Sequence, residues 1–288
     1  MASVTYQGKP ITLPTGQRHV VEVPARILRV RLTGMLFETD KTFLLPRAMR
    51  GIRSLVSLYQ AHPGMALVIT GHTDRVGGPS YNLGLSDERA RAIAHYLRDE
   101  VDDWLAWYSD QPYSAPWGTR EDQAMLSAIT DDATGHVFYA GPITGWLDAP
   151  TRDAVERYQA RRGLAVDGVP GPQTRRALVT DYMQLDGTTL PDGTEVHRLG
   201  CGEHHNAVPT ADGVAEPDNR RAEIFLFDPP PVEPPAPASC PGAGCPYETW
   251  RDRTVQTYDF GDEVLVDWDV FDFELLEARE QEHHGAEA

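Results

Sequence analysis

A short apolar run that leads into a glycine-rich loop constrains the fold of this 288-residue chain more than any other feature. Met65–Thr70 has the length and composition of a buried strand, and three glycines follow within residues 71–78. Apolar residues at helical spacing lie on both sides: Met49, Ile52, Leu55, Val56 and Tyr59 before the strand, and Ala90, Ile93, Ala94 and Leu97 after the loop. We therefore expect helix, strand, loop and helix in succession. The second helix is expected to begin near Ser86, with Asp87 and Glu88 in its first turn.

Other patterns extend this unit into an α+β fold. Residues 20–32 alternate between apolar and polar, and Val196–Cys201 and Ala222–Phe227 also have the character of strands. The apolar stripe of the second helix continues through residues 101–108, which is compatible with one helix that extends into the next segment. Residues 141–178 contain a weak internal repeat with an offset of 23, in which each copy is a turn followed by a helix.

Composition excludes several classes of partner. Asp and Glu number 43 against 26 Lys and Arg, and this net charge of −17 disfavours nucleic acids and anionic membrane surfaces. The apolar share of 41% is that of an ordinary globular protein. The apolar run at 65–69 is too short for membrane insertion. The first residues show no secretory signal, which indicates a protein made in the cytosol, although a mature form that had lost its signal would look the same.

The segment Thr70-Gly-His-Thr-Asp-Arg-Val-Gly, followed by Tyr81-Asn82, Leu85-Ser86 and Arg89-Ala90, resembles the OmpA C-terminal-like (peptidoglycan-associated) domain family. The resemblance covers residues 26–98. It resumes at Gly200-Cys-Gly-Glu and at Asn219-Arg-Arg-Ala-Glu-Ile, in the order that the family has. It implies a βαβα-type sheet-and-helix domain that binds peptidoglycan, and hence a place in the cell envelope or periplasm.

The chemistry of two of these residues suits a site for a zwitterion, although only the resemblance makes such a site the favoured interpretation. Asp74 lies at the strand end and Arg89 in the following helix, so a carboxylate can take an ammonium while a guanidinium fork takes a carboxylate. The alternative is an internal Asp74–Arg89 salt bridge that only fixes the loop. In the family, the matching pair binds the amino acid head of diaminopimelate in the stem peptide, which is the ligand that we expect here.

The resemblance brings further ligand-binding candidates to the same cleft. Phe37 and Asp40 stand where the family has a related segment, and Thr73, Asn82 and Leu85 match positions of its motif. An Asn in a turn and a Leu at a helix start are equally compatible with a structural role. Of Arg220 and Arg221, one is expected to point toward the cleft and the other away, because side chains alternate along a strand.

Residues 99–185 resemble a peptidoglycan-binding domain of the first type, a small helical module. The most specific part is Gly163-Leu-Ala-Val-Asp-Gly-Val-Pro-Gly-Pro-Gln-Thr174, and residues 123–129 are its expected first helix. Gly145-Trp-Leu-Asp148 departs from the usual form of the first copy. We interpret Asp167-Gly168 and Gly171-Pro172 as residues that form a turn and begin a helix, in preference to a role in ligand contact. The module is expected as an insertion that splits the OmpA-like domain.

A catalytic metal site is the main rival. Cys201, His204 and His205 lie close together in sequence and His72 and Asp74 follow another strand, but their spacing fits no strong zinc pattern. Adjacent His204 and His205 point in opposite directions in an extended chain, so at most one would join a cluster. Cys240 and Cys245 are expected to form a local turn or a disulfide. We therefore predict no metal, no cofactor and no catalytic residue.

The C-terminal region has a composition of its own. Residues 228–246 contain eight prolines, which is typical of an extended linker, and the last 30 residues carry 11 acids against one base, Arg279. Apolar and acidic residues alternate through residues 264–275. Such a segment either adds to a partner's sheet or folds back on the chain's own sheet edge. The overall organisation also resembles, more loosely, accessory proteins of contractile injection or type VI secretion spikes.

These observations predict six parts: an N-terminal extension (1–25), the OmpA-like domain in two parts (26–98 and 186–228), the inserted helical module (99–185), a proline-rich linker (229–248) and an acidic arm (249–288). The expected function is non-catalytic binding of peptidoglycan. The alternative is a cargo adaptor that docks a secretion spike or envelope protein through residues 249–288. Such an adaptor would be cytoplasmic until the secretion apparatus delivers it.

Overall fold

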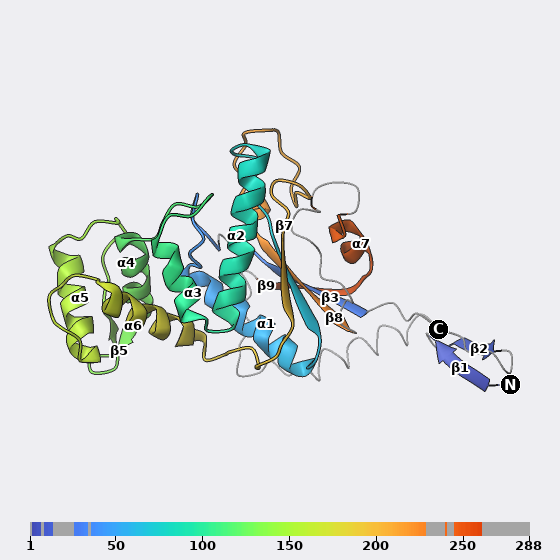
Figure 1. The fold of residues 1–288 in the computed structure, drawn as a ribbon, viewed down its shortest axis with the longest axis horizontal. Coiled ribbons are helices and arrows are strands. Elements are labelled where there is room, and N and C mark those ends of the chain that lie inside the picture. The colour runs from blue at the N-terminus through green and yellow to red at the C-terminus, as the bar shows by residue number, and fades with distance from the viewer. Residues whose placement is uncertain are drawn as a thin grey trace.

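The computed structural model describes residues 2–6, 9–13, 26–33, 36–228, 240 and 245–260. A five-stranded mixed sheet in the order β7-β4-β8-β3-β9 forms its centre (Figure 1). β8 is antiparallel to both β3 and β4, whereas β7 runs parallel to β4 and β9 parallel to β3. The strands are β3 (Arg26–Leu32), β4 (Ala66–Gly71), β7 (Val196–Gly200), β8 (Ala222–Asp228) and β9 (Thr254–Phe260). A separate hairpin consists of β1 (Ala2–Tyr6) and β2 (Lys9–Leu13).

Two long helices, α1 (Met49–Ala61) and α2 (Pro79–Leu97), pack on one face of the sheet. Alternate residues of the strands bury their side chains against these helices, as in Leu28, Leu67, Ile69, Ile224 and Leu226. β4 is buried along its whole length, as its apolar sequence predicts. The first helix and the strands expected near residues 66–70, 196–201 and 222–227 are confirmed, and so is the α+β class.

The expected start of α2 near Ser86 is wrong. The helix begins at Pro79, after Gly78 in an extended conformation, because the fixed φ of proline suits the first helical position. Arg89 therefore lies in the middle of the helix and not in its first turn. The apolar stripe also does not continue as one helix: Asp99 adopts a left-handed φ of 53°, and α3 (Val101–Leu105) starts anew.

Two glycines explain how closely α2 approaches the sheet. Gly71 at the end of β4 is paired with Gly200 at the end of β7. A Cβ atom on Gly71 would lie 2.1 Å from the carbonyl oxygen of Ser86, and one on Gly200 would lie 2.8 Å from the amide nitrogen of Asp87. Only glycine leaves room for the helix backbone at these two strand ends.

The inserted region is helical, with α3, α4 (Thr119–Ala128), α5 (Ala149–Arg162), α6 (Pro172–Met183) and a two-residue pair, β5 (Thr130–Asp131) and β6 (His136–Val137). It lies at the end of the molecule beyond α1 and α2 (Figure 1). Short 3-10 helices occur at Pro46–Ala48, Ala106–Tyr108, Gln184–Asp186 and Pro217–Asn219. The first helix expected at residues 123–129 is thus confirmed, with an earlier start.

An aromatic cluster joins the insert to the sheet-and-helix domain. Trp104, Trp117 and Tyr182 of the insert surround Phe43, with ring centroids 5.1–5.8 Å from it. The indole of Trp104 donates to the carbonyl of Ala92 on α2 at 2.8 Å. The Tyr182 hydroxyl donates to the carbonyl of Leu44 at 2.7 Å. The two parts therefore share one continuous core.

The internal repeat is visible as a repeated hydrogen-bond pattern. The side-chain oxygen of Gln123 accepts from the amides of Thr144 and Gly145, and that of Gln159 accepts from Asp167 and Gly168. Each side-chain amide donates to a threonine at the following helix, Thr151 at 2.8 Å and Thr174 at 3.0 Å. Buried glutamines thus hold both loops, although Gly145-Trp-Leu-Asp148 departs from the usual sequence.

The other face of the sheet is covered by α7 (Tyr247–Asp252), whose Tyr247 and Trp250 pack on Ile27, Phe225 and Phe227. β9 then adds to the edge of the sheet beside β3. The first part of the expected arm therefore folds back on the chain's own sheet. The strand expected at 264–275, like linker residues 229–239 and 241–244, lies outside the described residues.

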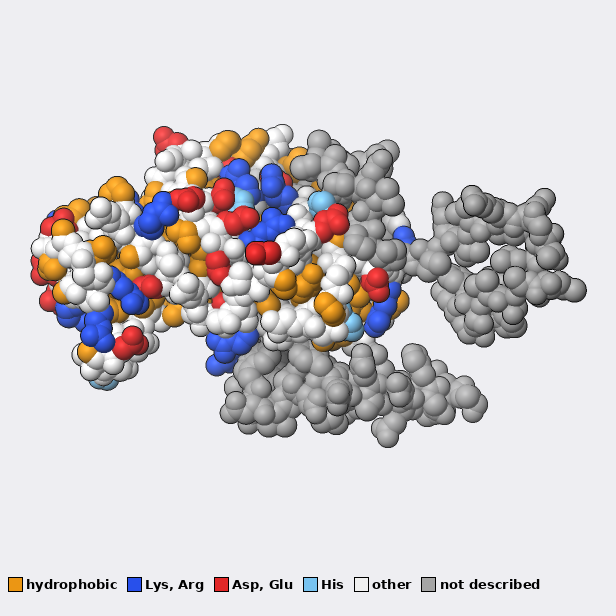
Figure 2. Space-filling view, turned by 60° about the horizontal axis from the view of Figure 1, so that its bottom comes forward, with side chains coloured by type: hydrophobic (Ala, Val, Ile, Leu, Met, Phe, Trp, Pro, Cys, Tyr) orange, Lys and Arg blue, Asp and Glu red, His pale blue; other side chains and the backbone are white. Residues whose placement is uncertain are grey.

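Basic and acidic side chains are interspersed over the body of the molecule (Figure 2). This fits the sequence, because 11 of the 43 acids fall in the last 30 residues. Among the described helices, none has the length and apolarity needed to cross a bilayer.

Candidate functional site

Asp74 lies three residues beyond β4, where the loop between β7 and β8 packs against it. Its Oδ2 accepts from Arg220 Nη1 at 2.6 Å and from the amide of Glu216 at 3.4 Å, and its Oδ1 accepts from the amide of Val76 at 3.2 Å. The residue is only 6% exposed. The ion pair of Asp74 is thus with Arg220, and the alternative of an Asp74–Arg89 salt bridge is not what the structure shows.

Arg89 is the most unusual charge of this region. Its Nε donates to the carbonyl of Lys41 and its Nη2 to that of Glu38, both at 3.0 Å, and the guanidinium lies 5.1 Å from the ring centroid of Phe37. The residue is 2% exposed. No carboxylate of the described residues forms an ion pair with it. Arg89 is therefore a buried cation held by neutral oxygens and an aromatic ring.

The charges around Arg89 are close enough to change its acidity. Burial and the nearby charge of Arg220 together lower the pKa of Arg89 to about 10, although Asp74 opposes the fall. Asp40 also acts on Arg89, and its carboxylate accepts from the Tyr81 hydroxyl at 2.7 Å. Phe37, Asp40, Asp74, Arg89 and Arg220 are thus brought together from four segments of the chain: the loop before α1, the loop after β4, helix α2 and the loop before β8.

Other predicted residues line or support this region. Thr73 donates its amide hydrogen to the carbonyl of Gly202 at 2.9 Å, and its buried hydroxyl has no hydrogen-bond partner among the described residues. The side-chain amide of Asn82 donates to Glu203 at 2.6 Å, so its observed contact is structural. Leu85 is buried at 3% exposure. Of these three residues, Thr73 is the one with unused hydrogen-bonding capacity.

Arg220 and Arg221 point to different partners, as the alternation predicts. Arg220 binds Asp74, whereas Arg221 Nε donates to Glu223 at 2.7 Å on the face covered by α7. Glu223 also accepts from Arg29 and from the Tyr247 hydroxyl. Sequence reasoning missed this buried network because it depends on α7 folding over the sheet. The one available signal was the Glu223 position of the closing motif.

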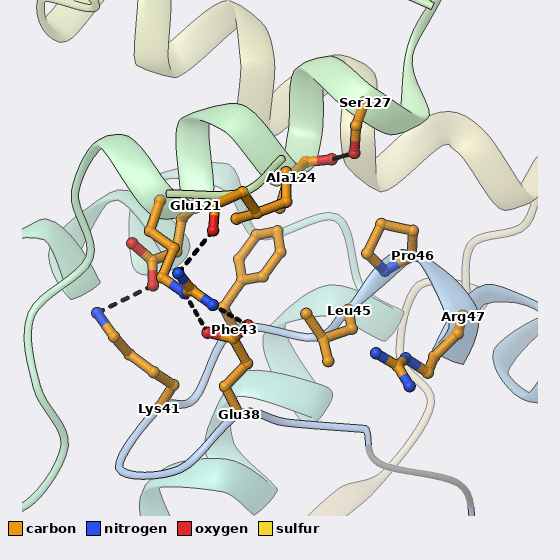
Figure 3. A pocket seen from close by; sticks show the side chains of 11 residues that line it. Glu38, Lys41, Phe43, Leu45, Pro46, Arg47, Glu121, Ala124 and Ser127 are labelled. Carbon is orange, nitrogen blue, oxygen red and sulfur yellow. Dashed lines mark hydrogen bonds and ion pairs between the residues drawn. The ribbon is translucent and has the colours of Figure 1, made fainter. Parts of the chain in front are cut away.

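A cavity of about 320 Å³ lies beside this region, between the loop before α1 and helix α4 (Figure 3). Phe43, Leu45, Ala124 and Ile143 give it an apolar lining. Its rim carries two ion pairs that cross between the two parts of the molecule, Arg120–Glu38 at 2.5 Å and Lys41–Glu121 at 2.9 Å. Glu38 and Lys41 are also the residues whose carbonyls hold Arg89, so one loop forms the wall of the cavity and the support of Arg89.

Comparison with known families agrees with this division. Residues 36–101 match the family described as "OmpA family", and residues 124–178 match the one described as "Putative peptidoglycan binding domain". The chain contains a domain of each kind. The OmpA match includes Phe37, Asp40, Asp74 and Arg89, and the structure adds β7, β8 and Arg220 from beyond the insert.

Similar proteins match the OmpA region. Outer membrane porin F of Pseudomonas aeruginosa is 33% identical over 76 residues, which are 26% of this chain and 21% of that protein. The peptidoglycan-associated lipoprotein of Legionella pneumophila is 33% identical over 63 residues, 22% of this chain and 36% of that protein. Outer membrane protein A of Salmonella typhi is 37% identical over 65 residues, 22% of this chain and 19% of that protein. The chain thus matches well under half the length of these relatives.

The whole chain was also compared with solved structures. The crystal structure of the peptidoglycan-associated lipoprotein from Burkholderia pseudomallei aligns with 66% of this chain and 86% of its own, with a TM-score of 0.30 and 15% identity.

Proposed function

We propose that this protein binds peptidoglycan without catalysing a reaction on it, and that its OmpA domain recognises the diaminopimelate of the stem peptide. The two domain matches support peptidoglycan as the ligand. The names of the relatives support a location in the cell envelope. The proposal includes the ligand-binding residues and the domain boundaries that the sequence predicts.

The observation that carries the proposal is the buried guanidinium of Arg89. A buried cation is costly unless an anion and hydrogen bonds compensate it. Arg89 has hydrogen bonds to two carbonyls but no carboxylate partner among the described residues. Arg220 lies close enough to act on it electrostatically. Asp74 pairs with Arg220, and Asp40 acts on Arg89 without forming an ion pair with it, so a carboxylate of the ligand supplies the direct partner that the Arg89 guanidinium lacks among the described residues.

Asp74 supplies the other half of the recognition. The amino acid head of diaminopimelate carries an ammonium beside its carboxylate, and Asp74 is the acceptor that we assign to it. Arg220 currently makes a charge-assisted bond to Asp74, so the ammonium either shares this carboxylate or displaces Arg220. The unpartnered hydroxyl of Thr73 adds a further donor or acceptor at the same place.

Binding to sacculi that contain diaminopimelate tests the proposal. We expect Asp74→Asn and Arg89→Lys each to weaken binding at least about thirtyfold, because truncating one partner of a buried charge pair costs about 2 kcal/mol or more. Arg89→Lys keeps the charge but loses the fork. Arg198→Ala, which removes a half-exposed arginine paired with Asp87 on the sheet edge, is the matched control and should bind as the natural chain does.

The ligand specificity is tested separately with free stem peptides. A peptide with diaminopimelate should compete with sacculi, and a peptide with lysine at the same position, which lacks the second carboxylate, should compete far less. Equal competition by both peptides, or binding by Arg89→Lys at the natural level with a native circular dichroism spectrum, would contradict the assignment of Arg89.

A further inference from the structure

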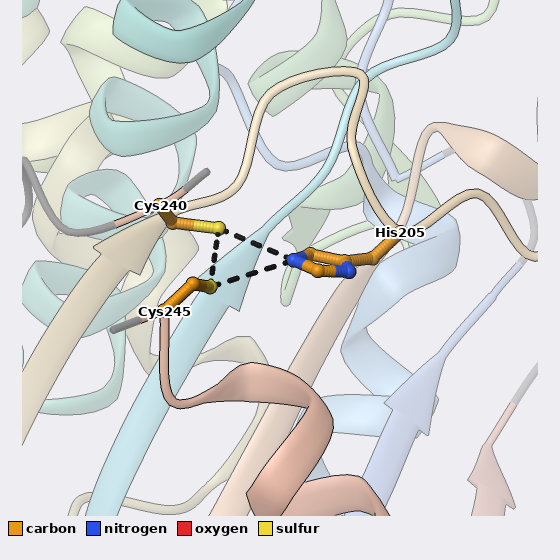
Figure 4. A group of neighbouring side chains, drawn as sticks. All are labelled: His205, Cys240 and Cys245. Atoms are coloured by element: carbon orange, nitrogen blue, oxygen red, sulfur yellow. Dashed lines mark hydrogen bonds between the residues drawn. The ribbon is translucent and has the colours of Figure 1, made fainter. Parts of the chain in front are cut away.

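A cluster of three ligand-type side chains lies on the face of the sheet opposite α1 and α2, apart from Asp74 and Arg89. His205 Nε2 lies 3.4 Å from the Sγ atoms of both Cys240 and Cys245, and these two Sγ atoms are 2.9 Å apart (Figure 4). All three ligand atoms lie within 4.8 Å of one another. All three cysteines of the chain are free thiols in the structure.

Cys201 is a neighbour of this cluster. It is fully buried and packs in the same apolar cluster as Cys240, although its Sγ does not lie within 4.8 Å of all three ligand atoms. Cys201 and His205 come from the loop that follows β7, whereas Cys240 and Cys245 precede α7. The cluster thus joins two chain segments that are about 40 residues apart, and His204 is not a member of it.

The imidazole of His205 is held in an orientation suited to a ligand. Its ring stacks on Tyr247 with centroids 4.5 Å apart, and its Nδ1 lies 3.4 Å from a carboxylate oxygen of Glu248. A carboxylate on the far nitrogen is the usual support of a metal-binding histidine, because it fixes the tautomer that leaves Nε2 free. His205 also adopts a left-handed φ of 63°, with its carbonyl held by Arg221 at 2.8 Å.

We propose that Cys240, Cys245 and His205 Nε2 bind one soft divalent metal ion, with Zn²⁺ as the preferred ion, and that the Cys201 side chain moves toward this ion as its fourth ligand. Three thiolates and one imidazole are a common structural zinc set. A tetrahedral zinc ion places its ligand atoms about 3.5–3.8 Å apart. The two distances of 3.4 Å to His205 already fit this geometry, and the pair of Cys240 and Cys245 has to open by under about 1 Å.

A site with four protein ligands has no open position, so its role is structural. It would tie the segment before α7 to the loop that follows β7, and thereby hold Tyr247 and Trp250 on the sheet. This gives a reason for the contact of Cys240 and α7 with the sheet of the domain. The inference does not depend on the proposed binding of peptidoglycan.

The metal content of the full chain is the first test. Protein purified anaerobically without chelator should contain close to one zinc per chain by elemental analysis. After removal of zinc, cobalt(II) should bind with the same stoichiometry and give the thiolate-to-cobalt charge-transfer and ligand-field absorption of a tetrahedral site. Absence of both, in a chain whose circular dichroism spectrum is folded, would overturn the proposal.

Variants identify the ligands. Cys240→Ser, Cys245→Ser and His205→Ala should each lose most of the zinc, whereas His204→Ala, which removes the neighbouring imidazole, should keep it. Cys201→Ser should change the cobalt spectrum by losing one thiolate; an unchanged spectrum would contradict the four-ligand site. A Cys240–Cys245 disulfide, detected by alkylation of the anaerobic protein without reductant, would also contradict it.

Discussion

At the residue scale, Glu223 determines how the charges beneath α7 are compensated. It is fully buried and accepts hydrogen bonds from Arg29, Arg221 and Tyr247. Burial raises its pKa, but the neighbouring His72, Arg29 and Arg221 hold the pKa of this carboxyl well below its usual range. Such a carboxylate stabilises the fold once it is ionised in both states, above its unfolded pKa of about 4.3.

We expect Glu223→Gln to lower the free energy of unfolding by about 3–5 kcal/mol at pH 7, because it leaves two arginines without a buried counter-charge. The difference from the natural chain should shrink as pH falls below about 4, where the natural carboxylate loses its advantage by protonation. Urea unfolding at several pH values measures both effects. Glu195→Gln, at an exposed pair with His197, is the control and should change stability by under about 1 kcal/mol.

At the element scale, the sequence predicted those elements whose signals are local. The strand at 66–71 and helix α1 follow from apolar runs and their spacing, and the motif around Asp74 and Arg89 placed both residues near one loop. The start of α2 was missed although Pro79 carries a local signal for it. The pairing of Asp74 with Arg220, 146 residues away, depends on the sheet register and has no local signal.

The C-terminal elements also depend on contacts that have no local signal in the sequence. The region from residue 249 was expected as an arm, but α7 and β9 cover a face and an edge of the sheet. Cys240 and Cys245 meet His205 only because α7 and the residues just before it lie on this face. Spacing along the sequence does not report such a return, which explains why the cysteine spacing gave no recognisable metal pattern.

Two truncations test the role of these elements. A chain that ends at residue 260 retains α7 and β9 and serves as the reference for the shorter chain. A chain that ends at residue 246 loses Tyr247, Trp250 and β9, and its free energy of unfolding should fall by several kcal/mol, at about 2–3 kcal/mol for each large buried side chain. Thermal unfolding followed by circular dichroism distinguishes them. Equal stability of the two chains would show that α7 is not part of the folded core.

At the scale of the whole molecule, the insert and the OmpA domain should unfold as one unit. Trp104 lies between them, fully buried, against Phe43, Tyr96 and Tyr182. We expect Trp104→Ala to lower the free energy of unfolding by about 3–5 kcal/mol. The variant should unfold in a single transition at a lower temperature, seen both by circular dichroism and by tryptophan fluorescence. Two separate transitions in the natural chain, with only one shifted by the substitution, would show that the insert is an independent domain.

A shared core also fixes the distance between the two surfaces that we expect to meet the cell wall. Trp146, in the first repeat loop of the insert, is 75% exposed, and Val169 at the equivalent position of the second loop is 44% exposed. Single exposed apolar side chains are common on protein surfaces, so a contact between Trp146 and peptidoglycan is an expectation that substitution tests.

If both surfaces bind one sacculus, their rigid connection makes the second contact intramolecular, and avidity exceeds either affinity by a factor of about 100 or more. Trp146→Ala and Asp74→Asn should then each remove most of this gain, and the double variant should retain only residual binding. Val255→Ala, at a side chain 63% exposed on β9, is the matched apolar control and should bind normally. Natural binding by Trp146→Ala would confine recognition to the OmpA site and would leave the insert a structural role, as the support of the loop that holds Arg89.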